Sequence, residues 1–400
     1  MKTETAVLIQ KHDRQLSIVF AMIIFLQFIT NASDLVSKLT GISSSMVSLM
    51  CKLVILAALF YLLPTIYFRF NRPLGFFLLS SGGIVTVNYL FFSDNPYFMA
   101  NVTTFLITIL PMVVLILEIE EKTCLLEALH KASLCIAVIC VLLILMYPVI
   151  VTSKFKYSMG FSNSLILPAI VLTSVVFEKD KPLWKKVSAL IACMALTAAA
   201  TIYGSRGALI SIAVFFVYCL LFIYRPHNTS GLIMKFGGTT LILTGILFYR
   251  QILLLLYELT LSFGYTNRTL RLLATQAGHD SGRIDIWMQV IREIKAHPFA
   301  VRGINADYIL LKGYCHNIFL DFSYNFGLIL GVPLCIAIVV LILRSLRYAG
   351  VPHSRLQTVM LFSTFPTLLW SESVWTFTLF WLWLVLAVKD LRITWVRRVA

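Results

Sequence analysis

The chain has 400 residues, of which 59% are hydrophobic and 13% charged, and it carries a formal net charge of +15. This profile is typical of a polytopic membrane protein and excludes a soluble protein, whose core cannot hide so many apolar runs of about 20 residues. The Lys and Arg residues lie mostly in short clusters between apolar runs, so they indicate topology rather than nucleic-acid binding.

The sequence predicts an all-α membrane fold with about twelve membrane-spanning helices. No small-residue cleavage site follows the first apolar run, which is therefore read as a retained span rather than a signal peptide. No linker or internal repeat is found, so residues 1–400 are predicted to form a single membrane domain. The expected spans are 16–33, 45–68, 73–92, 98–118, 131–151, 158–177, 184–203, 207–224, 233–257, 317–343, 356–372 and 375–388.

Alternation of these spans places most Lys and Arg of the short loops on one side of the membrane. Short loops rich in Lys and Arg stay in the cytoplasm. Both termini are therefore expected to be cytoplasmic. The long loop 259–316, between the ninth and tenth spans, is expected to be extracytoplasmic.

The eight cysteines show no CxxC pattern and no Cys/His metal-ligand spacing. Most fall within predicted spans, where cysteine serves as a small apolar residue. The sequence thus predicts no disulfide framework, no metal site and no cofactor.

The loop 259–316 is the one long polar stretch of the chain. Within it, residues 283–295 repeat apolar positions at helical spacing, and Pro298 ends the pattern. We expect this helix to lie along the membrane surface with Trp287 at the headgroup level. The residues expected to share its apolar face are Ile284, Trp287, Met288, Ile291 and Ile294.

His316 ends this loop and is the candidate catalytic base. Asn317 is expected to cap the following helix, with Asp321 in its first turn near the positive end of the helix dipole. A neutral histidine fixed at the mouth of the bundle can accept a proton from a hydroxyl. The alternative is an interfacial histidine without a chemical role.

Arg206 and Arg283 are candidate phosphate-binding residues, because a guanidinium group binds phosphate oxygens in a bidentate way. Arg206 stands between Gly204 and Gly207, and Arg283 follows Gly282. The alternatives are an arginine that reaches lipid phosphates and an ordinary solvated loop charge. Arg302, before Gly303, is the best of the weaker candidates.

Two further residues could bind substrate on the same side of the membrane. Asn163 lies in the segment Gly160–Asn163, which opens a predicted span and could hydrogen-bond a sugar. Glu372, between Ser371 and Ser373, could orient a base or bind sugar hydroxyls, or it could simply mark a helix end.

A candidate base and two candidate phosphate-binding arginines thus map to one membrane face, with no nucleotide-binding glycine motif and no metal-ligand cluster. This combination suits a substrate that is already a membrane-bound diphosphate. The arginines would neutralise charge on the leaving group.

At these residues the sequence resembles the O-antigen polymerase and O-antigen ligase family of bacterial envelope polysaccharide synthesis. The matching segments are Gly204–Ala208, Gly282–Arg283 with Trp287, His297–Pro298, His316–Leu320, Asn325–Gly327 and Gly331, with Gly160–Asn163 as a further match. One departure is visible: the family usually has a tighter Gly-x-Gly after the His-Pro pair, where this chain has Val301-Arg302-Gly303.

The resemblance implies a metal-independent, GT-C-like glycosyltransferase in the bacterial inner membrane, with its active site facing the periplasm. The donor would be an oligosaccharide or polymer on undecaprenyl diphosphate. Arg206 and Arg283 would hold the diphosphate, and His316 would deprotonate the acceptor hydroxyl. A chain-length regulator is a further candidate partner.

The acceptor separates two branches of the family. A polymerase uses another lipid-linked repeat unit, and a ligase uses the lipid A-core. The tail from His316 to Gly327 favours the polymerase. A polysaccharide flippase or solute transporter is the alternative from another class, against which the absence of an internal repeat counts.

Overall fold

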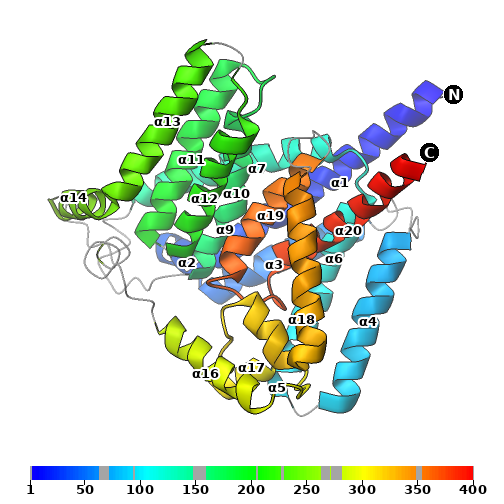
Figure 1. Ribbon diagram of the computed structural model, residues 1–400. Helices are drawn as coiled ribbons and strands as arrows, with labels where there is room; N and C mark the ends of the chain where they lie inside the picture. Colours follow the sequence, from blue (N-terminus) through cyan, green and yellow to red (C-terminus); the bar gives the residue numbers. More distant parts are fainter. Residues whose placement is uncertain are drawn as a thin grey trace. The chain divides into compact units, whose positions relative to one another are not determined.

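The computed structural model describes residues 2–62, 72–92, 95–146, 159–203, 206–226, 229–262, 271, 282–347 and 354–399 (Figure 1). Most of these residues lie in helices, and none of them lies in a strand. The predicted all-α fold is therefore confirmed. The chain divides into two compact units, residues 1–63 with 121–279 and residues 64–120 with 280–400, and each is described by itself. The single membrane domain stays a prediction.

Eight of the described helices are long and apolar enough to cross a membrane, as in a multi-pass integral membrane protein. They match eight of the twelve predicted spans. Two more predicted spans correspond to shorter apolar helices, Gly207–Ile223 and Thr378–Lys389. The eight long helices are Gln10–Asn31, Ser44–Tyr61, Leu74–Phe92, Pro96–Glu118, Lys122–Leu145, Met159–Val176, Leu183–Tyr203 and Ile318–Arg347.

The remaining two predicted spans differ from the expectation. The run 233–257 is divided between α13 (Thr229–Leu247) and α14 (Tyr249–Ser262). The run 356–372 forms the 14-residue helix α19 (Arg355–Leu368), which is buried along nearly its whole length. An apolar run can therefore mark a core helix as well as a span, and twelve spans stay a prediction.

The first unit is built around α10, which is apolar all round and buried from Ile166 to Val175. It packs against α7, α11 and α12. The Tyr203 hydroxyl donates to Leu143 O at 2.6 Å and ties α11 to α7. The helices of this unit are α1 (Lys2–Asn31), α2 (Ser33–Thr40), α3 (Ser44–Leu62), α7 (Lys122–Leu145), α9 (Met159–Ser164), α10 (Ile166–Val176), α11 (Leu183–Tyr203), α12 (Arg206–Tyr218), the π-helix η2 (Cys219–Ile223), α13 and α14.

The second unit packs α19 against α20, where the rings of Phe365 and Trp383 meet edge to face at 4.7 Å. Lys389 of α20 donates to Leu117 O of α6 at 2.9 Å. The helices of this unit are α4 (Arg72–Phe92), α5 (Pro96–Thr104), the π-helix η1 (Phe105–Ile109), α6 (Leu110–Glu118), α16 (Arg283–Ala296), α17 (Ala306–Leu311), α18 (Ile318–Arg347), α19 and α20 (Thr378–Val399).

Helix α18 is broken at Gly327, whose φ of 65° and ψ of 171° are not helical. A Cβ at Gly327 would lie 3.0 Å from Ala300 O. A Cβ at Gly331 would lie 2.6 Å from Phe322 O, so the chain beyond the break packs against the chain before it. The predicted continuous span 317–343 is therefore interrupted, and both glycines are required by close backbone contact.

We expect Gly331→Ala to destabilise the protein by about 1–3 kcal/mol, because the new methyl group forces two backbone segments apart. The matched control is Gly83→Ala in α4, where an added Cβ meets no atom within 4 Å. Thermal unfolding in detergent measures both. Equal melting temperatures for the two variants would contradict the close packing at Gly331.

Candidate functional site

The loop before the candidate base is anchored at Gly303 in the second unit. Gly303 has φ 85°, and a Cβ there would lie 2.6 Å from a ring carbon of Phe92. Ile304 N donates to Asn88 Oδ1 at 2.6 Å, and Asn95 Nδ2 donates to Ile304 O at 3.0 Å. The Arg302-Gly303 turn, where the sequence departs from the family pattern, is thus fixed against α4 and the start of α5.

The described hydrogen bonds of the Arg302 side chain all go to main-chain carbonyl groups of the same unit. Its guanidinium donates to the carbonyls of Ala300, Tyr324 and Glu293 at 3.2–3.3 Å. Its Cζ also lies 4.5 Å from the centroid of the Tyr324 ring. These contacts are structural, so they give no support to the prediction that Arg302 binds substrate.

His316 has a left-handed backbone, with φ 57°, which is uncommon outside glycine although Asn, Asp and His adopt it more often than other residues. Trp287 Nε1 donates to Cys315 O at 2.9 Å, just before it. Asn317 Oδ1, just after it, accepts from Phe319 N at 3.0 Å and from Leu320 N at 3.2 Å. The predicted cap of α18 by Asn317 is confirmed. Such a conformation persists only where its surroundings over-determine it, as they often do at functional sites.

The ring of His316 has a defined tautomer. Nδ1 lies 3.0 Å from Ser371 O. A carbonyl oxygen can only accept a hydrogen bond, so Nδ1 carries the proton and the lone pair is on Nε2. The Tyr314 hydroxyl donates to the same carbonyl at 3.1 Å, and its ring centroid lies 4.2 Å from that of His316. The half-buried imidazole is thus oriented as a base.

Arg283 lies close enough to His316 to influence its charge. Burial lowers the pKa of His316 below 6.5, the hydrogen bond to Ser371 raises it, and the Arg283 charge lowers it further. Arg283 begins α16 after Gly282, whose φ is 79°, and its Cζ lies 5.9 Å from the Trp370 ring centroid. Arg283 and His316 thus lie at neighbouring residues, Trp370 and Ser371, and the lowered pKa favours the neutral imidazole.

We expect activity to be retained at pH 6.5 and to fall only at lower pH, where the imidazole becomes protonated. Arg283→Gln removes a positive charge near the ring, so it should move this acid limb to higher pH. The dependence of kcat/KM on pH measures both effects. An acid limb above pH 6.5, or one that Arg283→Gln leaves in place, would contradict the described electrostatics.

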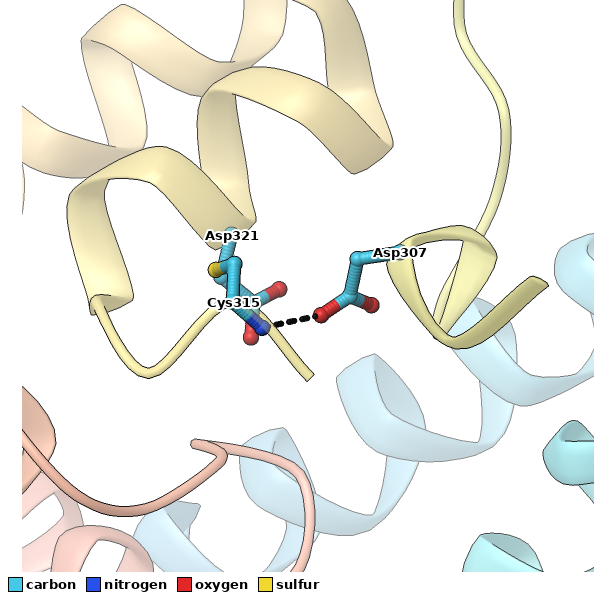
Figure 2. A group of neighbouring side chains, drawn as sticks. All are labelled: Asp307, Cys315 and Asp321. Carbon is cyan, nitrogen blue, oxygen red and sulfur yellow. Dashed lines mark hydrogen bonds between the residues drawn. The ribbon is translucent and has the colours of Figure 1, made fainter. Parts of the chain in front are cut away.

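Cys315, the residue before His316, belongs to a buried polar cluster with Asp307 and Asp321 (Figure 2). The two carboxyl groups and the thiol each place one atom within 4.8 Å of the others. Asp307 Oδ2 accepts from Cys315 N at 3.0 Å, and Asp321 Oδ1 accepts from Asn325 Nδ2 at 2.6 Å. Trp375 Nε1 donates to the same Asp321 oxygen at 3.0 Å. Asp321 was expected at the start of α18 for its charge alone, yet it is buried in this network.

The same three side chains could be considered as metal ligands. Burial raises the pKa of the Cys315 thiol well above its usual value. The thiol also donates to Asn317 O at 3.2 Å. Burial raises the pKa of Asp307 to about 6. In the described structure these side chains are held by hydrogen bonds to Cys315 N, Asn317 O, Asn325 Nδ2 and Trp375 Nε1.

The other predicted site residues are distributed over both units. Arg206 is the first residue of α12, and Asn163 is buried in α9, both in the first unit. The Arg206 side chain lies outside the described residues. Glu372 is half-buried in the second unit, directly after the Ser371 carbonyl that binds His316.

The predicted loop helix is confirmed as α16, but its environment differs from the expectation. Ile284 and Met288 are exposed, whereas Val290 is fully buried and Ile294 packs against the cluster around it. Trp287 meets the Trp370 ring at 5.4 Å besides its bond to Cys315. Its described contacts are thus internal to the unit, and its place at the headgroup level stays a prediction.

Sequence reasoning missed Asp307, Tyr314 and Trp375 as parts of this site. Asp307 is one acidic residue in a polar loop, and its local sequence does not indicate that its side chain is buried. Asn325 was predicted only as part of a sequence motif, yet its amide accepts from the Asp307 main-chain N–H and donates to the Asp321 carboxyl group.

In comparisons with protein-family models and with curated proteins, nothing matches this chain.

Proposed function

We propose that this protein is a membrane glycosyltransferase that transfers a glycan from a lipid-linked diphosphate donor to a sugar hydroxyl. One observation carries the proposal: His316 Nδ1 is bound to Ser371 O, which leaves Nε2 as the basic nitrogen, and the charge of Arg283 acts on the same ring. A general base next to a fixed cation suits a reaction that removes a proton from one oxygen and leaves negative charge on another.

The reaction can be written with these residues. His316 Nε2 takes the proton of the acceptor hydroxyl, and the oxygen forms a bond to the anomeric carbon of the donor sugar. The bond from that carbon to the diphosphate oxygen breaks, and the diphosphate leaves with the electron pair. Arg283 neutralises the charge that develops there. Attack opposite the leaving group inverts the anomeric centre.

Three further roles come from the sequence and the family resemblance. Arg206 would be a second cation for the diphosphate, while Asn163 and Glu372 would bind sugar hydroxyls. Replacement of Arg206 by Lys tests the first role, since lysine keeps the charge but lacks the planar fork. Full activity of that variant would show that bidentate binding at residue 206 is not needed.

We favour a polymerase, whose donor and acceptor are both undecaprenyl-diphosphate-linked glycans at the periplasmic face of a bacterial inner membrane. The alternative acceptor is the lipid A-core, which would make the protein a ligase. Deletion of the gene, read on a lipopolysaccharide gel, separates the two. A single repeat unit on the core indicates a polymerase, and bare core with accumulated lipid-linked polymer indicates a ligase.

A reconstitution experiment tests the enzyme proposal against a transporter. The purified protein in liposomes is given lipid-linked oligosaccharides extracted from the deletion strain. A polymerase lengthens the glycan with no other protein present. A transporter moves the glycan across the bilayer at unchanged length, and that result would overturn the proposal.

A further inference from the structure

Both attachments of His316 lead back to one buried carboxyl group, that of Asp321. On the main-chain side, Cys315 N donates to Asp307 Oδ2 at 3.0 Å. Asp307 N in turn donates to Asn325 Oδ1 at 3.3 Å, and Asn325 Nδ2 donates to Asp321 Oδ1 at 2.6 Å. A path of hydrogen bonds thus runs from the backbone beside the base to Asp321.

On the ring side, the path starts at the imidazole. His316 Nδ1 donates to Ser371 O at 3.0 Å, and four residues later Trp375 Nε1 donates to Asp321 Oδ1 at 3.0 Å. The two paths meet at one carboxylate oxygen and form a closed ring. Backbone and imidazole of His316 are therefore held from two directions by one network.

We propose that Asp307 is a positioning residue for the base, acting with Asp321 through this ring to hold His316 in its left-handed conformation. The proposal deepens the proposed function and rests on it for the catalytic role of His316. Asp307 is fully buried and touches Cys315 rather than His316 itself. It therefore acts on the reaction only through the placement of its neighbour.

The chemistry of the Asp307 side chain supports this role. Its side chain is buried, and the desolvation raises its pKa to about 6. What the network uses is the acceptor oxygen toward Cys315, which a neutral side chain can supply as well as a charged one. An amide at residue 307 should thus replace the carboxyl group, whereas an aliphatic side chain of similar size should not.

The variants Asp307→Asn and Asp307→Leu apply this distinction. Asparagine keeps an acceptor oxygen, and leucine fills the space without one. Gln357→Leu is the matched control, because it also removes a buried hydrogen bond of the second unit, the 2.8 Å bond from Nε2 to Ser345 Oγ. Trp375→Phe breaks the ring on its other side while keeping an aromatic side chain, in case the leucine variant does not fold.

The first readout does not depend on activity. Hydrogen–deuterium exchange of the peptide covering residues 313–318 should rise about tenfold in Asp307→Leu and several-fold in Trp375→Phe, through loss of one hydrogen bond. Asp307→Asn and Gln357→Leu should leave it unchanged. Unchanged exchange in both Asp307→Leu and Trp375→Phe would overturn the proposal, and so would unchanged exchange in Trp375→Phe alone if the leucine variant does not fold.

The second readout is the lengthening of extracted lipid-linked oligosaccharide by reconstituted protein. Asp307→Leu should lower kcat about a hundredfold with little change in KM, because a displaced base costs the chemical step and not binding. Asp307→Asn should restore the rate. An inactive asparagine variant with normal exchange would overturn the proposal, since it would show that the charge or a bound cation is needed. If His316 variants stay active while exchange rises as expected, the proposed function fails and the positioning network stands.

Discussion

Replacement of His316 by Asn lowers the rate of glycan transfer by about two to four orders of magnitude, the usual contribution of a general base. Asparagine is the informative substitution, because it tolerates the left-handed backbone at φ 57° and so separates lost chemistry from added strain. Reconstituted protein and extracted lipid-linked oligosaccharide provide the measurement. In cells, the same variant leaves only short glycans on the gel.

His297→Asn is the matched control for this experiment. His297 belongs to the same loop and caps the end of α16, but its side chain is exposed. It should retain close to full activity. A His316→Asn protein that still makes long polymer would show that another group accepts the proton.

Replacement of Arg283 by Ala lowers kcat/KM by about two to three orders of magnitude, as expected for one preorganised cation at a leaving group. Arg283→Lys should recover only part of this loss, because an ammonium group is a single point charge and lacks the guanidinium fork. Both variants are compared at saturating and limiting donor, so that donor binding and the chemical step are separated.

Arg292→Ala controls for general loss of charge on the same helix, since Arg292 is exposed on α16. It should be nearly neutral. Comparable losses in the Arg283 and Arg292 variants would mean that the loop attracts the anionic donor through its overall charge. In that case Arg283 would have no specific part in the reaction.

Much of the fold could be predicted from composition and periodicity. Apolar runs of span length indicated helices, and eight are long and apolar enough to cross a membrane. The helix from Arg283 and the cap at Asn317 also followed from local pattern. The break at Gly327 did not, because glycine is common in membrane helices. The break is required by contact with Phe299 and Ala300, which are far from it in the sequence.

The site shows the same division. His316 and Arg283 could be selected because their side chains suit the chemistry. The residues that hold them in place could not be predicted, because the burial of Asp307 depends on how α17 and α18 pack. The partner of the imidazole had no sequence signal at all, because it is the main-chain carbonyl of Ser371.

That carbonyl has a consequence for how the protein tolerates change. Every amino acid carries the same oxygen, so no substitution at residue 371 deletes the acceptor that sets the tautomer of His316. The acceptor therefore survives a change of side chain, although the full burial of Ser371 restricts residue 371 to small side chains. The orientation of the base depends instead on the length of the segment between Leu368, the last residue of α19, and Thr378, the first residue of α20. One residue inserted or lost there would shift the carbonyl away from the ring. A point mutation therefore does not remove the carbonyl group that orients this base, whereas an insertion or a deletion displaces it.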